Sequence, residues 1–185
     1  MAASGLGGCA AALPQPGLVL QAVADGVWFA QGEAALGSRE NRNFISNAGV
    51  IVAPRGVVLV DALGSPALAR ELLAAVAVQT TKPVTDVIVT HYHADHVYGL
   101  QVFAQAGARI IAHRAARDYL ASDAARLRLA NSIAEGLTQA GTRLVEATQW
   151  VDGSTLLDMA GERVELRAVG PAHTAEDLAD RKSVV

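Results

Sequence analysis

The chain has 185 residues, enough for one domain with a buried core and too few for two ordinary domains. Hydrophobic residues make up 51% of the chain and charged residues 18%, which excludes an intrinsically disordered protein. The net charge of −3 offers no basic surface, so nucleic acid is not expected as a partner, and the single cysteine, Cys9, rules out an intramolecular disulfide.

The N-terminal segment, residues 1–17, is predicted to precede a single folded domain over residues 18–185. Residues 1–12 are small and apolar and end in three alanines, as in the cleavage region of a secretory signal. No Lys or Arg precedes them, so a signal-peptide remnant and a disordered leader both stay open. A signal would favour the periplasm or the cell exterior over the cytoplasm, and no apolar run reaches the roughly 18 residues of a transmembrane helix.

The folded part is predicted to begin with two β-hairpins. Apolar and alternating runs predict four strands, over residues 18–23, 27–31, 44–53 and 57–60. Asp25-Gly26 suits the first tight turn because glycine accepts a positive φ, and Pro54-Arg55-Gly56 suits the second. The polar segment 32–43 between the hairpins is predicted to be a loop.

The middle of the chain alternates strand and helix. Ser65-Pro66 predicts a helix start, a capping side chain followed by proline at the first helical position. Further helices are predicted over 99–105 and, in two parts ended by Gly141, over 114–140; further strands are predicted over 84–89, 109–112, 143–151, 154–158 and 162–169. This alternation predicts an α/β fold.

A cluster of three histidines and one carboxylate follows the apolar run over residues 87–89. Residues two apart in an extended backbone point to the same side, so His91, His93 and Asp95 are predicted to converge from one strand end. The following turn is expected to bring His96 back towards them. Imidazole nitrogen and carboxylate oxygen suit Zn²⁺, and Fe or Mn less exclusively, so the sequence predicts a metal site.

The pattern His91-x-His93-x-Asp95-His96-x-x-Gly99 resembles in full the signature of the metallo-β-lactamase-fold hydrolases. The resemblance runs from about residue 27 to residue 177 and implies the N-terminal part of an αββα sandwich, with mixed sheets and flanking helices. It implies that His91, His93 and His173, the last in a His-Thr pair after a predicted strand, hold a first metal. It also implies that Asp95 and His96 belong to a second.

The resemblance further implies a role for each carboxylate near this cluster. Asp95 is expected to be catalytic, accepting a hydrogen bond from the attacking water and passing its proton to the leaving group, and orienting a ligand histidine is the alternative. Asp61 follows a predicted strand where the family places an aspartate beneath the histidines. A helix-capping or turn role for Asp61 stays equally open.

The function implied is a zinc-dependent hydrolase that uses metal-bound hydroxide on a small ester, thioester, lactone or lactam. Two alternatives are open: a truncated, non-catalytic metal-binding remnant, and an iron-dependent oxygenase or sulfur-handling enzyme of the same fold. No histidine follows His173, and residues 178–185 carry neither the strand nor the ligands with which the family pattern continues. The chain is therefore expected to be C-terminally truncated, with the second metal site incomplete. No pattern in the sequence indicates an oligomeric state.

Overall fold

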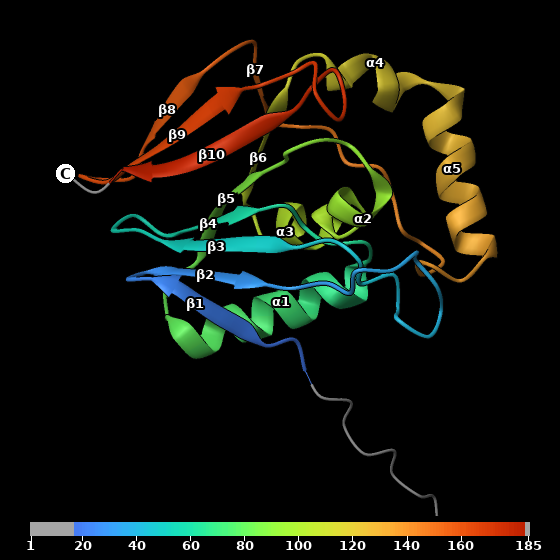
Figure 1. Cartoon of the computed structure of the whole chain (residues 1–185), viewed down its shortest axis with the longest axis horizontal. Helices are drawn as coiled ribbons and strands as arrows, with labels where there is room; N and C mark the ends of the chain where they lie inside the picture. The colour runs from blue at the N-terminus through green and yellow to red at the C-terminus, as the bar shows by residue number, and fades with distance from the viewer. Residues whose placement is uncertain (1–16, 184–185) are drawn as a thin grey trace, which may run out of the picture.

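Two β-sheets and a layer of helices make up the computed structural model, which describes residues 17–183. The predicted leader thus lies outside the described residues apart from Gly17. Sheet A has seven strands in the order β1 to β7, and sheet B has three in the order β10-β9-β8. Figure 1 shows α1 along one side of sheet A and sheet B on the other.

The bounds of the elements follow the chain. Sheet A contains β1 (Leu20–Ala24), β2 (Val27–Ala30), β3 (Ala48–Val52), β4 (Val57–Val60), β5 (Val84–Ile88), β6 (Arg109–His113) and β7 (Gln149–Val151). Sheet B contains β8 (Thr155–Asp158), β9 (Arg163–Ala168) and β10 (Leu178–Ser183). The helices are α1 (Pro66–Gln79), α2 (Ala94–Val97), α3 (Leu100–Gln105), α4 (Ala116–Ala121) and α5 (Asp123–Ala134).

Sheet A is mixed, because its first four strands are antiparallel and β4 to β7 run parallel. The first turn contains Gly26 at φ +70°, as its sequence predicted. Helix α1 crosses from β4 to β5 and begins where the Ser65 hydroxyl accepts the Leu68 N–H at 3.2 Å. The parallel arrangement brings the carboxyl ends of β4 and β5 to one edge of the sheet, where open α/β sheets bind their ligands.

Both faces of sheet A are buried along β3 and β4, which explains why these two strands are continuous apolar runs rather than alternating ones, whereas β1 at the edge is mostly exposed. Along β4, Val57 and Leu59 face the helices, whereas Val58 faces sheet B. In sheet B, Leu157 is buried and its neighbour Leu156 is 58% exposed, so this sheet buries one face only. Three layers of the predicted αββα sandwich, one of helices and two of strands, therefore lie within residues 17–183.

Several predicted boundaries are wrong for local physical reasons. Helix α5 ends at Ala134 rather than near Gly141, because Gly136 takes φ +73° and turns the chain out of the helix. Of the strand predicted over residues 143–151, only the last three residues form a strand, β7 (Gln149–Val151). Residues 178–183, which were expected to form no strand, pair with β9 along its whole length as β10. Within the described residues, every helix is too short or too polar to cross a bilayer.

Candidate metal centre

The histidine cluster lies at the edge of sheet A where β4 and β5 end side by side. Val60 pairs with Ile88, and the Asp61 N–H donates to the Ile88 carbonyl at 2.8 Å. The chain leaves β5 through Thr90 into His91, and leaves β4 through Asp61. The two strands therefore deliver a histidine and an aspartate to the same point.

Three imidazoles meet at this edge, as the family resemblance implied. One ligand nitrogen from each of His91, His93 and His173 lies within 4.8 Å of the other two. The ring centroids are 4.7 Å apart for His91–His93, 4.9 Å for His91–His173 and 4.7 Å for His93–His173. Residues 80 positions apart in the chain are thereby brought into contact, since His93 Nδ1 and His173 Nε2 are 3.0 Å apart.

The three imidazoles fit a metal ion. His91 Nε2 is buried and has no hydrogen-bond partner among residues 17–183, and such an atom costs about 1–3 kcal/mol when nothing satisfies it. A cation between the rings would satisfy it. Three histidine nitrogens with a fourth position open is the ligand arrangement of a catalytic zinc site.

The surroundings keep two of these histidines neutral, which is the form that binds a metal. Burial lowers the pKa of His91 to about 4, and the charge on His96 adds to the effect. Burial and the neighbouring His173 lower the pKa of His93 as well. Metal binding at neutral pH thus requires no proton release from His91 or His93.

Asp95 is placed differently from the sequence-based expectation. It lies in the first turn of α2, not in an extended strand, so it does not share the alternation of His91 and His93. Its Oδ2 is 3.3 Å from His96 Nε2. Although burial opposes the effect, the hydrogen bond from His96 lowers the pKa of Asp95.

His96 is held between two carboxylates. Its Nδ1 lies 2.7 Å from Asp61 Oδ2, and its Nε2 faces Asp95. Burial favours the neutral ring, but the hydrogen bonds to Asp61 and then Asp95 outweigh it and raise the pKa of His96 to about 10. No third group joins Asp95 and His96 as a metal-binding cluster in the described part of the chain.

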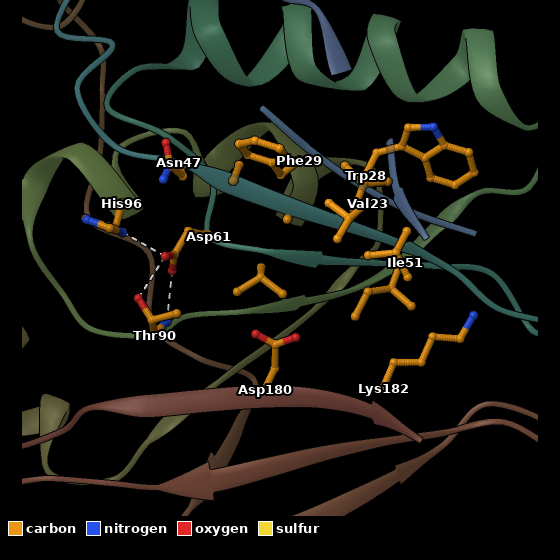
Figure 2. A pocket seen from close by; sticks show the side chains of 15 residues that line it. Val23, Trp28, Phe29, Asn47, Ile51, Asp61, Thr90, His96, Asp180 and Lys182 are labelled. Atoms are coloured by element: carbon orange, nitrogen blue, oxygen red, sulfur yellow. Dashed lines mark hydrogen bonds and ion pairs between the residues drawn. The ribbon is translucent and has the colours of Figure 1, made fainter. Parts of the chain in front are cut away.

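Asp61 connects the two halves of the centre through hydrogen bonds (Figure 2). Its carboxylate accepts the Thr90 N–H at 2.8 Å and the Thr90 hydroxyl at 2.7 Å, besides contacting His96. The Thr90 hydroxyl in turn lies 3.0 Å from His91 Nδ1. The sequence also left open a helix-capping role for Asp61, but α1 is capped by Ser65. Asp61 also takes φ +64°, a conformation that aspartate and asparagine tolerate better than most residues.

A cavity of about 520 Å³ adjoins this hydrogen-bond network between sheet A and β10. Figure 2 shows Trp28 and Ile51 on one side of it and Asp180 and Lys182 reaching in from β10 on the other. Asp61, Thr90 and His96 lie at one end, away from most of the apolar side chains. The network is therefore open to an inner space between the sheets.

Asp177, to which the sequence assigned no function, holds the loop that carries His173. Asp177 accepts the backbone N–H groups of His173, at 2.5 Å, and Thr174, at 2.9 Å, and also the Thr174 hydroxyl. These hydrogen bonds lower the pKa of Asp177, although burial opposes them. The spacing of this acidic residue, four positions after a loop histidine, was the sequence signal for this role.

A comparison with protein families decides the kinship of this chain. The family model described as the metallo-beta-lactamase superfamily matches residues 41–178, well over half of the sequence. The chain belongs to the metallo-β-lactamase superfamily. This confirms the resemblance drawn from the His91-to-Gly99 pattern.

Relatives in the superfamily cover the chain to different extents. A metallo-beta-lactamase type 2 of Bacillus cereus is 40% identical over 62 residues, which is 34% of this chain and 24% of the relative. Among solved structures, a motif variant of the Cronobacter sakazakii metallo-beta-lactamase aligns with TM-score 0.63 and 20% identity, over 90% of this chain and 60% of that one. The Pontibacter korlensis metallo-beta-lactamase aligns with TM-score 0.63 and 18% identity, over 89% and 66%. The chain thus spans less than two thirds of these relatives, whose structures support the predicted mixed α/β fold.

Proposed function

We propose that this chain is a zinc-dependent hydrolase of small ester, thioester, lactone or lactam substrates. The observation that carries the proposal is the meeting of His91, His93 and His173 around the buried, unpartnered Nε2 of His91. Membership of a hydrolase superfamily supports the same reaction type.

The three histidines would hold the metal, each through one ring nitrogen. A zinc ion there would supply a Lewis acid that activates water and polarises the scissile carbonyl. The Thr90 hydroxyl, fixed by Asp61, would set the orientation of the His91 ring through its contact with Nδ1. His91 would then present Nε2 towards the other two rings.

Asp95 would carry the proton transfers. Its carboxylate is ionised at neutral pH, because its pKa is lowered, so it can accept a hydrogen bond from the attacking water and then the proton. The same oxygen would deliver that proton to the leaving oxygen, sulfur or nitrogen. His96 would hold the carboxylate in place from its other side.

Metal analysis tests the ligand set separately from catalysis. Elemental analysis of protein purified without added metal and then dialysed against zinc should give about one zinc per chain. His173→Gln should lose the ion, whereas His113→Gln should keep it, because His113 lies at the end of β6 and outside the cluster. A folded protein that binds no metal would overturn the proposal. Iron found in the purified protein before the dialysis against zinc would favour oxygenase or sulfur chemistry.

Turnover is tested with a chromogenic cephalosporin, a thioester, a lactone and a nitrophenyl ester. At least one should be hydrolysed by the zinc-loaded protein, and Asp95→Asn should lower kcat by about 10²–10⁴-fold while leaving zinc bound. Zinc bound with no turnover of any of the four would identify a non-catalytic metal-binding protein instead.

A further inference from the structure

Sheet A extends beyond sheet B on the side of its first strands, because sheet A has seven strands and sheet B has three. Val27 on β2 pairs with Ile51 on β3, so both side chains point to the face of sheet A on which sheet B lies. Ile51 is 3% exposed there, whereas Val27 is only partly buried and Val23 on β1 is 64% exposed. Among the described residues, the apolar face of β1 and β2 is therefore left partly uncovered.

This uncovered face forms one wall of the cavity of about 520 Å³ that lies between sheet A and β10. The lining is mostly apolar and includes Val23, Val27, Phe29, Ile51 and Val60. Protein sites that bind small molecules have volumes of about 300–1,000 Å³ and mostly apolar walls with a few polar groups. The cavity therefore has the size and the surface to hold a small organic molecule.

One charged group of this cavity is not balanced by a neighbour. Asp61 pairs with His96 at 2.7 Å, and Lys182 pairs with Glu162 at 3.1 Å. Asp180, in contrast, reaches from β10 into the space between the sheets (Figure 2) and has no ion-pair partner within the described part of the chain. The lining thus carries one unbalanced negative charge, at Asp180.

The surroundings of Asp180 oppose its ionised form. Burial raises the pKa of the Asp180 carboxyl, and the charge on Asp61 adds to this rise, whereas hydrogen bonding to its own backbone N–H opposes it. No cation of the described residues lowers this pKa. A carboxylate beside apolar walls loses hydration without gaining a partner, so a bound cation would stabilise it. An anionic ligand would be repelled.

We propose that this cavity binds a small organic ammonium ion with an apolar body. The ammonium group pairs with Asp180, and the body lies against the apolar side chains of β1 to β3. Trp28 and Phe29 also line the cavity, and the faces of aromatic rings attract cations. The three histidines that meet at the metal centre do not line this cavity, so the inference does not rest on the proposed hydrolase function.

Calorimetry tests this with two probes of the same shape, using the full chain freed of metal by a chelator, because amines also bind zinc. The first probe, 2-phenylethylammonium, carries a charge, and the second, 2-phenylethanol, does not. The wild type should bind the ammonium about tenfold more tightly, the lower range for a hydrogen bond to a charged group. Asp180→Asn should abolish this preference. Asp180→Lys should instead bind 3-phenylpropionate, an anion of similar size, more tightly than the wild type does.

Asp118→Asn is the matched control, because it makes the same change in net charge at an exposed position of α4, outside this cavity. It should keep the wild-type preference. In urea unfolding, Asp180→Asn should have the wild-type midpoint or a higher one, since it removes a charge that burial destabilises. The proposal is overturned if the folded wild type binds the two probes equally or not at all. An equal loss of preference in Asp118→Asn, or a lower urea midpoint for Asp180→Asn, would overturn it as well.

Discussion

Replacing Asp61 should show how strongly the hydrogen-bond network under the histidines stabilises the fold. Asp61 is 4% exposed, and its carboxylate accepts from the Thr90 N–H, the Thr90 hydroxyl and His96 Nδ1, all at 2.7–2.8 Å. Asp61→Ala removes every acceptor at once. Asp61→Asn keeps one carbonyl oxygen and tolerates the left-handed backbone, but loses the charge.

The magnitudes follow from these contacts. Removing one partner of a buried ion pair costs about 3–5 kcal/mol, so Asp61→Ala should lower the free energy of unfolding by about 4 kcal/mol. Asp61→Asn forfeits mainly the charge assistance of the hydrogen bonds and should cost about 2 kcal/mol. With an m-value of about 2 kcal/mol per molar urea, the unfolding midpoints should fall by about 2 M and 1 M.

The pH dependence gives a sharper test. The folded-state pKa of His96 is raised from 6.5 to about 10, so its stabilisation is fully present below pH 6.5 and is lost as the pH rises through 10. The stability gap between the wild type and Asp61→Asn should therefore be widest near pH 6.5 and narrow towards pH 10. Protonation of His91, whose pKa is lowered to about 4, affects the stability only at more acidic pH.

The assay is urea unfolding of the metal-free protein, followed by fluorescence of its two tryptophans between pH 6.5 and pH 10. Asp152→Asn is the control, because Asp152 pairs with Arg114 on the exposed surface and its removal should leave the midpoint unchanged. An Asp61→Asn gap that stays the same from pH 6.5 to pH 10 would refute the ion pair between Asp61 and His96.

Four further outcomes are expected. Asp86→Ala should cost about 3 kcal/mol in urea unfolding, because Asp86 is fully buried and paired with two arginines; a loss as small as that of a surface residue would contradict this. Gly99→Ala should cost about 3 kcal/mol, since its Cβ would meet a backbone oxygen at 1.9 Å, whereas Gly107→Ala, with open space and φ +85°, should cost about 1 kcal/mol. Asp177→Ala should weaken zinc binding about 10–100-fold in competition with a chelator, and equal affinity would show that the His173 loop holds itself. Bound zinc, measured by equilibrium dialysis, should decline as the pH falls through about 4, where protons compete for His91, and full retention at pH 3 would exclude histidine ligands.

The sequence predicted those parts of the centre that depend on local spacing. His91 and His93 alternate along an extended segment, and the predicted helix start at Ser65-Pro66 is where α1 begins. The place of Asp95 was predicted wrongly, because a turn of helix begins at Ala94 and the strand alternation stops there. Tertiary packing sets that boundary, and the apolar pattern before it carries no sign of the change.

Long-range contacts were predicted only where a family resemblance supplied them. The approach of His173 to His93 depends on the register of β9 and β10 and on the hydrogen bonds to Asp177, none of which the residue pattern defines. The burial of Ala125 and Ser132 is equally hidden, because the sequence does not show which face of α5 packs inwards. These features arise when segments distant in the chain meet.

The segment between β6 and β7, which contains α4 and α5, should tolerate substitutions with little loss of stability. Helix α5 lies outside the sheet, and only Ala125 and Ser132 of its residues are buried. Most replacements along it should therefore lower the free energy of unfolding by less than about 0.5 kcal/mol. The histidines, in contrast, are anchored at strand ends that both cores depend on. Saturation libraries aimed at α5 should therefore yield mostly folded proteins, while libraries aimed at β4 and β5 should yield mostly aggregates.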